Sequence, residues 1–163
     1  MDDEQSEIEA AVSALDSMLC FGLYAAARAM NRRYTTLLEP WGLTYPQYLV
    51  LILLWERRES TVSGLAESMM LDLGTTSPLV RRLEGHGFVT RERSASDERR
   101  VMVSLTVTGL ALREELAHIP GCIAEATGIT LPEFTSTLTT LHNITTNLST
   151  APAAGAHVIE RQN

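Results

Sequence analysis

Residues 72–106 read DLGTTSPLVRRLEGHGFVTRERSASDERRVMVSLT, and this stretch decides the fold. Its apolar residues recur at helical spacing over 79–83 and then alternate with polar residues over 101–105. A change of period from 3.6 to 2 predicts a helix followed by strands. We therefore expect a helix that ends at Gly85 to Gly87, and a two-stranded hairpin of residues 88–91 and 101–105 with a long charged loop between them.

Helical patterns also precede this stretch. Thr44 followed by Gln47 is a capping box, and it predicts a helix whose body runs to Glu56. Next comes a short helix through Val62 to Met69, with Thr61 or Ser63 as its N-cap. A turn at 72–74 separates this helix from the following one, which is predicted to hold Pro78 in its first turn. The order helix, short helix, turn, helix, hairpin over 44–106 is that of a winged helix-turn-helix.

Long amphipathic segments flank this region. Apolar residues form one helical stripe within 8–38, and a second helical region spans 107–149, interrupted at Pro120. Terminal helices of this kind can pair across a two-fold axis, so both segments are predicted to form a dimerisation region. We expect one domain over 1–163, mainly α with a small β-hairpin wing (α+β) and dimeric, while the patternless tail 150–163 is expected to be mobile.

Composition indicates a soluble globular protein, with 45% hydrophobic and 20% charged residues. The chain has no apolar run as long as the ~18 residues of a membrane span, and its N-terminus is acidic where a secretory signal is basic. These features predict a cytoplasmic protein. The net charge of −7 argues by itself against nucleic acid, but the distribution is uneven, because all thirteen basic residues are arginines and six of them lie within 81–100.

This local basic strip predicts a DNA-binding surface. The start of the helix after the turn offers short hydroxyl side chains, its later turns offer arginines, and the hairpin offers more arginines, of which Arg99 or Arg100 would meet a narrow minor groove. An alternative is that the hydroxyls only cap the helix and that the arginines are solvated. The predicted DNA-binding residues are Thr75, Thr76, Ser77, Arg81, Arg82, Arg91, Arg93, Arg99 and Arg100.

The two cysteines, Cys20 and Cys122, belong to no CxxC or Cys/His ligand pattern, and the four histidines form no HxxxH pair. We therefore predict no metal site and no cofactor. Cys20 lies on the first helical stripe with Tyr24 at i+4, so the two side chains share a face. From the residues alone, the favoured interpretation of Cys20 is a small buried hydrophobe beside an aromatic ring.

Residues 18 to about 148 resemble the MarR family of regulators, and in particular its OhrR branch, which senses organic hydroperoxides. The resemblance is carried by Leu19-Cys20-Phe21 with Tyr24, by Leu43-Thr44-Tyr45-Pro46-Gln47-Tyr48, by Leu71-Asp72 with Gly74-Thr75 and Pro78, and by Ser96-Asp97-Glu98-Arg99 with Val103-Ser104-Leu105-Thr106. It implies a homodimer that binds a pseudo-palindromic operator on double-stranded DNA and represses a nearby gene, and it implies a stabilising role for Asp97 in the wing.

The resemblance also implies a redox sensor. Cys20 matches the sensing cysteine of the branch, and tyrosines that match Tyr24, Tyr34 and Tyr45 surround that cysteine, one of them from the other subunit. Oxidation of Cys20 by an organic hydroperoxide, the inducer, would then release the DNA. The sulfenic acid would be resolved either by Cys122 of the partner subunit, as in two-cysteine relatives, or by a small thiol.

Two other hypotheses stay open at this point. In one, the same fold responds to an apolar or phenolic ligand in a dimer-interface cleft, and Cys20 is structural. In the other, the chain is a thiol peroxidase. The sequence carries no signature of such an enzyme, such as a resolving CxxC or a paired base, so we expect that the chain is not an enzyme.

Overall fold

The computed structural model describes residues 15, 17–94 and 97–151, without the side chains of 94 and 97–99. The chain divides into two compact units, Met1–Ile123 and Ala124–Asn163, which are described separately. The predicted tail 150–163 and the N-terminal part of the predicted stripe lie mostly outside the described residues. Within the described part of the chain, no helix is long and apolar enough to cross a membrane.

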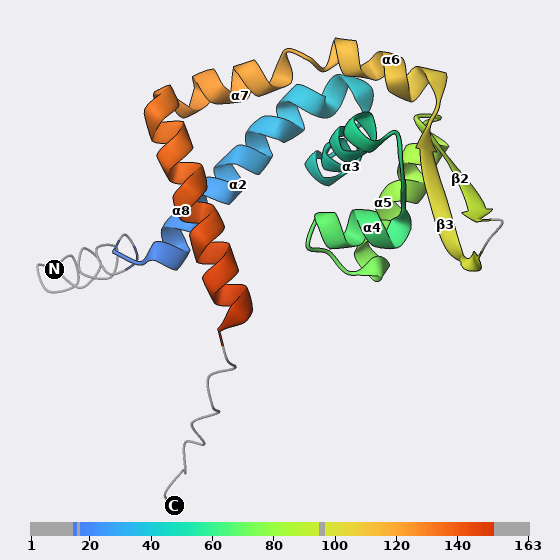
Figure 1. Ribbon diagram of the computed structural model, residues 1–163. Coiled ribbons are helices and arrows are strands. Elements are labelled where there is room, and N and C mark those ends of the chain that lie inside the picture. The colour runs from blue at the N-terminus through green and yellow to red at the C-terminus, as the bar shows by residue number, and fades with distance from the viewer. Residues whose placement is uncertain (1–14, 16, 95–96, 152–163) are drawn as a thin grey trace, which may run out of the picture. The chain divides into compact units, whose positions relative to one another are not determined.

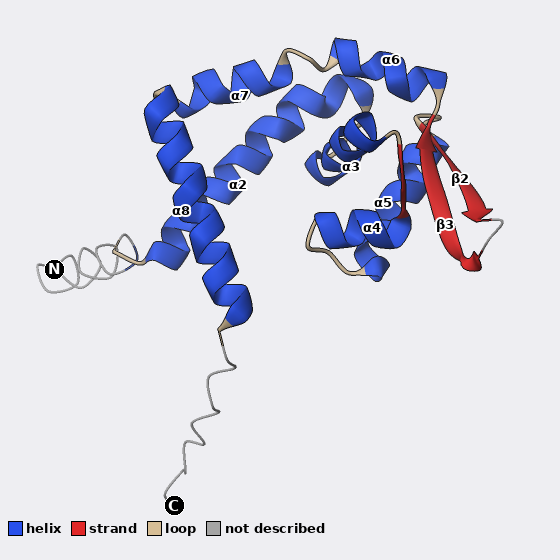
Figure 2. Ribbon diagram, viewed as in Figure 1, coloured by secondary structure: helices blue, strands red, loops and turns tan. Residues whose placement is uncertain are grey.

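The first unit is built mainly from helices, with a small sheet at one end (Figures 1 and 2). Along the chain its elements are α2 (Leu19–Leu38), the 3-10 helix η1 (Glu39–Trp41), α3 (Tyr45–Arg57), β1 (Glu59–Thr61), α4 (Val62–Ser68), α5 (Leu73–Gly85), β2 (Val89–Ser94), β3 (Asp97–Leu105), α6 (Val107–Glu115) and the start of α7 (Ile119–Thr127). The second unit holds the end of α7 and α8 (Leu131–Thr150). This is the predicted mainly helical winged helix-turn-helix fold.

Helix α3 forms the centre of the core. The predicted capping box is present, because Thr44 and Gln47 exchange hydrogen bonds at the N-terminus of this helix. Leu51 and Leu54 of α3 are fully buried, and they belong to one apolar cluster with Val80 of α5 and Val103 of β3. Burial of these side chains is the main term that holds α5 and the sheet against α3.

The sheet has three strands in the order β1-β3-β2, all antiparallel, where the sequence predicted a two-stranded hairpin. The additional strand, β1, pairs Glu59 with Ser104 and Thr61 with Met102. The predicted long loop over 92–100 is also wrong, since β2 extends to Ser94 and β3 begins at Asp97. Antiparallel pairing continues through these polar residues because a hairpin that projects from the core needs only backbone hydrogen bonds to extend.

Helix α5 begins at Leu73, after Asp72 as N-cap. The side chain of Asp72 accepts a hydrogen bond from the backbone N–H of Thr75 at 2.7 Å. Pro78 was predicted in the first turn of this helix, but it lies one turn further on, inside the helix. Because proline has no N–H, the carbonyl of Gly74 lacks the donor that residue 78 would otherwise supply.

The first turn of α6 packs tightly against the residue before the wing. Thr106 is its N-cap, and its side chain accepts from the N–H of Gly109. A Cβ atom at position 109 would lie 2.0 Å from the carbonyl oxygen of Phe88, so only glycine fits there. The same oxygen accepts from the N–H of Thr106 at 3.0 Å. The base of the wing and the start of α6 are therefore joined through their backbones.

Two helices leave apolar side chains uncovered. In the first unit, Leu19 of α2 is 65% exposed, and most of α2 before Tyr34 is exposed. In the second unit, α8 has no buried residue, and Leu131 and Phe134 are 77% and 45% exposed. Exposure of an apolar helix stripe to water is unfavourable, so such faces require a partner that covers them.

Candidate DNA interface and thiol site

Helix α5 presents a polar face made of residues from successive turns. Thr75, Arg81 and Arg82 are exposed, and Ser77 is half-buried. Ser77 and Arg81 are four residues apart, so their side chains lie on the same side of the helix. This face can donate hydrogen bonds to phosphates and to base edges from both hydroxyl and guanidinium groups.

Thr76, which the sequence predicted to contact DNA, does not belong to this face. Its side chain is fully buried, and its hydroxyl donates to the backbone oxygen of Asp72 at 2.9 Å. Thr76 lies four residues before Val80 and seven before Leu83, both of which are buried, and this spacing of an apolar helix stripe could have excluded it.

A hollow of about 240 Å³ joins the exposed face of α5 to the wing. Its polar lining comes from Ser63 at the start of α4, Ser77 and Arg81 on α5, and Arg91 on β2. Two hydroxyls and two guanidinium groups around one concave surface form a suitable environment for a phosphate oxygen. The sequence placed Ser77, Arg81 and Arg91 in the DNA-binding set but missed Ser63, which it considered only as a helix cap.

The arginines of the wing differ in their surroundings. Arg91 forms an ion pair with Glu84 of α5, with Nη2 2.7 Å from Oε2, so its charge is already partly balanced. Arg93 and Arg100 are exposed. The side chains of Arg99 and Asp97 lie outside the described residues, and their predicted roles stay predictions.

Cys20 is an exposed free thiol in the first turn of α2. Tyr24 follows one turn later, and its hydroxyl accepts a hydrogen bond from Nη1 of Arg28 at 2.8 Å. The ring of Tyr24 is tilted against the ring of Phe21, with 6.5 Å between centroids. Cys20 and Tyr24 therefore share an exposed aromatic surface within one chain.

Three tyrosines gather where α2 meets α3. The ring of Tyr34 stacks on that of Tyr45 at 4.2 Å, and the ring of Tyr48 lies 5.9 Å from Tyr34. Burial, with the neighbouring phenols as smaller causes, raises the pKa of Tyr34 to about 12. Burial also raises the pKa of Tyr45 and of Tyr48. These hydroxyls thus stay protonated at neutral pH and can donate hydrogen bonds.

Within one chain, the thiol and the tyrosine cluster are far apart. Cys20 and Tyr34 are fourteen residues apart on the same helix. At 1.5 Å per residue, this separation is about 21 Å along the helix axis. The structure therefore brings Tyr24 to Cys20 but does not bring Tyr34 and Tyr45 to it. Sequence reasoning missed Tyr48, although its spacing of three from Tyr45 places both on one helix face.

Cys122 lies in the first turn of α7 and is a half-buried free thiol. The sequence predicted an interruption at Pro120, but the break between α6 and α7 lies at 116–118. Pro120 stands in the first turn of α7, where the N–H that proline lacks has no partner within the helix. Among the residues that the structure describes, no group of three or more histidine, cysteine or acidic side chains could hold a metal ion.

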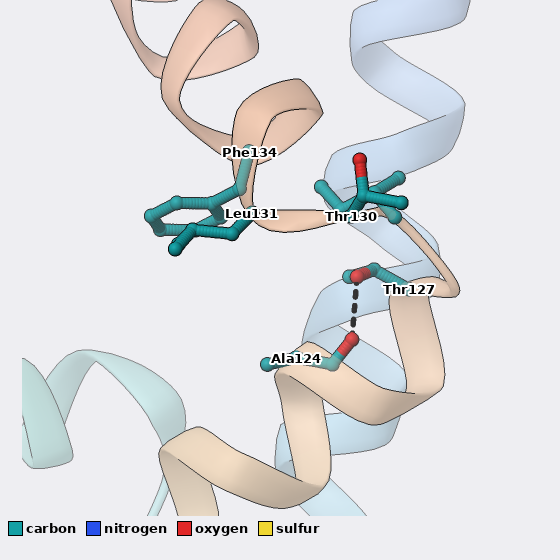
Figure 3. Close-up of a pocket in the computed structure, with 6 residues that line it drawn as sticks. Ala124, Thr127, Thr130, Leu131 and Phe134 are labelled. Atoms are coloured by element: carbon teal, nitrogen blue, oxygen red, sulfur yellow. Dashed lines mark hydrogen bonds between the residues drawn. The ribbon is translucent and has the colours of Figure 1, made fainter.

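The second unit carries an apolar hollow of about 260 Å³ where α7 turns into α8. Leu131 and Phe134 project from the start of α8 on one side of it, and Ala124 and Thr127 lie on the other (Figure 3). The hydroxyl of Thr127 donates to the carbonyl of Ala124 at 2.7 Å, so the lining offers little free polar capacity. This surface is suited to an apolar side chain.

A helix with a polar face, held beside an antiparallel wing that carries arginines, defines a winged helix-turn-helix DNA-binding protein. The model of the MarR family matches residues 43–101. The organic hydroperoxide resistance transcriptional regulator of Bacillus subtilis (strain 168) is 45% identical over 130 residues, which cover 78% of this chain and 88% of that protein. The chain belongs to the MarR family, and it is a transcriptional regulator.

Solved structures of AbfR from Staphylococcus epidermidis are also similar to the chain. Reduced AbfR bound to DNA is 30% identical with a TM-score of 0.69, and the match covers 91% of this chain and 99% of that one. Disulfide-formed AbfR is 30% identical with a TM-score of 0.55, over 88% of this chain and 96% of that one. These relatives are DNA-binding regulators and not enzymes, and regulators of the MarR family bind operator DNA as dimers.

Proposed function

We propose that the chain is a dimeric repressor that leaves its operator when an organic hydroperoxide oxidises Cys20. The observation that carries this proposal is the separation of about 21 Å between Cys20 and Tyr34 along an exposed helix. If two copies of α2 pair antiparallel across a two-fold axis, Cys20 of one subunit meets Tyr34 and Tyr45 of the other. The exposed face of α2 is then covered, and two identical sensing sites form.

The chemistry of each site follows from its side chains. Tyrosine hydroxyls that remain protonated can donate hydrogen bonds to the thiolate sulfur of Cys20, and the thiolate is the form of cysteine that acts as a nucleophile. The thiolate sulfur attacks the terminal oxygen of the hydroperoxide and the O–O bond breaks. The sulfur keeps the OH group as a sulfenic acid, and the alkoxide takes a proton from water and leaves as the alcohol. The aromatic surroundings, Phe21 and Tyr24 among them, favour an organic hydroperoxide over hydrogen peroxide.

The sulfenic acid then condenses with a second thiol and releases water, which leaves a disulfide. The thiol is supplied by Cys122 of the partner subunit or by a small thiol. Cys122 is a half-buried free thiol in the first turn of α7. A disulfide form of AbfR, a relative of similar fold, supports a disulfide as the oxidised product.

In the reduced dimer, we propose that α5 of each subunit enters a major groove and that the wing approaches the adjacent minor groove. Two such helices read a pseudo-palindromic operator whose half-sites are about 34–36 Å apart. An intersubunit disulfide needs its two Cα atoms within about 7 Å, so its formation shifts helices at the dimer interface. This shift changes the spacing of the two α5 helices, and DNA is released.

The test uses a duplex selected from random sequence by the reduced protein, and it measures anisotropy of the labelled duplex. Cumene hydroperoxide should release wild-type protein, and Cys20→Ser should stay bound. Release of Cys20→Ser by the hydroperoxide would overturn the redox proposal and favour an apolar ligand. Non-reducing electrophoresis of Cys122→Ser then separates the two routes of resolution, because a disulfide-linked dimer that survives this substitution would exclude Cys122.

A further inference from the structure

A continuous set of contacts runs from the tyrosine cluster to the base of the wing, and it begins inside α3. Tyr48 and Trp55 are seven residues apart on this helix, so they share a face. Their rings meet edge to face at 6.1 Å, and both residues are almost fully buried. The ring of Tyr48 also lies against the ring of Tyr34, which stacks on that of Tyr45.

From Trp55 the contacts leave α3. Its indole Nε1 donates to the backbone oxygen of Gly109, on α6, at 2.8 Å in a buried position. Gly109 in turn faces the carbonyl oxygen of Phe88 so closely that no side chain fits between them. The N–H of Phe88 donates to the backbone oxygen of Leu83, near the end of α5, at 3.0 Å. Strand β2 begins at Val89, directly after Phe88.

We propose that Trp55 is a positioning residue that transmits the state of the tyrosine cluster to the wing and the end of α5. This inference rests on the proposed function, because it requires that oxidation of Cys20 disturbs Tyr34 and Tyr45 of the partner subunit. A close-packed interior has no free space to absorb a displaced ring, so a change at Tyr34 must be accommodated by its neighbours. The hydrogen bond from Trp55 joins α6 to the tyrosine rings, and its donor is a side chain.

The first experiment compares two matched substitutions that each remove one indole donor. Trp55→Phe removes the buried bond to the backbone of Gly109, and Trp41→Phe removes an exposed indole bond of 2.7 Å to the carboxylate of Glu115 that lies outside the series. The readout is the ratio of operator Kd values in the oxidised and the reduced protein. We expect this ratio to fall at least fivefold in Trp55→Phe and to stay at the wild-type value in Trp41→Phe.

The rate of sulfenic acid formation at Cys20 is measured in the same samples and should be unchanged. A wild-type ratio of one would mean that the proposed function itself is wrong. A wild-type ratio well above one, together with the same ratio in Trp55→Phe, would overturn only the role of Trp55.

A second measurement does not depend on the folding of Trp55→Phe. The sequence has two tryptophans, so Trp41→Phe leaves Trp55 as the sole indole fluorophore. Oxidation with cumene hydroperoxide in the absence of DNA should shift its emission maximum, and the double substitution with Cys20→Ser should show no shift. An unchanged emission in protein that does lose DNA on oxidation would contradict the proposal.

Discussion

The guanidinium of Arg91 and the carboxylate of Glu84 form an ion pair across the junction between the wing and α5, with 2.7 Å between Nη2 and Oε2. Both side chains are partly exposed, at 28% and 37%. A pair of this kind adds little to stability, but it leaves Arg91 with less positive charge to offer a phosphate than Arg81 has on the same hollow.

The salt dependence of DNA binding should therefore separate these two arginines. Arg81→Ala should lower the slope of log K against log salt by about one, because one phosphate contact is lost. Arg91→Ala should lower it by clearly less, since Glu84 becomes unpaired at the same time. Titrations at several salt concentrations measure both slopes, and equal losses would show that the ion pair opens in the complex.

Thr76 and Thr75 are neighbours on α5, and we expect substitution of the first to change stability and substitution of the second to change DNA binding. Thr76→Val should lower the free energy of unfolding by about 1 kcal/mol, because a buried hydroxyl that donates to Asp72 is lost, and it should leave the operator Kd of the folded protein unchanged. Thr75→Val, at the exposed position, should weaken operator binding. Urea unfolding and anisotropy titrations measure the two effects. Loss of affinity in folded Thr76→Val would contradict the buried placement.

The pKa of Tyr34, raised from 10.0 to about 12, predicts a loss of stability at high pH. Between these values the unfolded chain loses the phenolic proton while the folded chain retains it. The contribution is therefore fully present below pH 10 and declines as the pH rises toward about 12. Urea unfolding of Tyr34→Phe should show a weaker decline over this range than wild type. Equal declines in the variant and in wild type would contradict this assignment to Tyr34.

Glycine is essential at position 109 and dispensable at position 85. Gly109→Ala places a methyl group 2.0 Å from the carbonyl oxygen of Phe88, so we expect a loss of about 3 kcal/mol or failure to fold. Gly85→Ala meets nothing within 4 Å at the end of α5, and it should raise stability by up to about 1 kcal/mol. Thermal unfolding compares the two, and a stable Gly109→Ala protein would refute the close approach.

The exposed stripe of α8 should contribute to the dimer interface. Phe134→Asp places a charge on this stripe and should convert the dimer to a monomer, with at least a tenfold loss of operator affinity. Asn143→Asp adds the same charge about half a turn away around the helix and should have no effect on assembly. Sedimentation gives the mass of each variant, and an intact Phe134→Asp dimer would exclude this face from the interface.

Caps and periodicity predicted the helices well. The capping box at Thr44 sets a helix start where the sequence placed it, and of the two candidate caps Thr61 and Ser63 it is Thr61 that caps α4, because each cap is a local interaction. Strand β1 was missed, since its three residues show no alternation and pair only with distant β3. The lengths of β2 and β3 depend likewise on backbone pairing between segments, which no pattern within either segment reveals.

The candidate site was predicted less completely. Arg81 and Tyr34 were found from their residue types and the family resemblance. Sequence reasoning did not find the ion pair of Arg91 with Glu84 or the hydrogen bond from Trp55 to Gly109. Both join residues whose contact depends on how separate elements pack. The burial of Thr76 and the place of Tyr48 did have signals in the sequence, in their spacings from Val80 and from Tyr45.

The distance along α2 between Cys20 and Tyr34 has a genetic consequence. Under the proposed function, each sensing site takes its thiol from one gene product and its phenols from the other. A mixed dimer of a Cys20→Ser chain and a Tyr34→Phe chain then holds one intact site and one site with both defects. Two alleles that are each insensitive to hydroperoxide should thus complement each other when expressed together. A chain that carries both substitutions forms a homodimer in which each site has both defects, so it should stay insensitive.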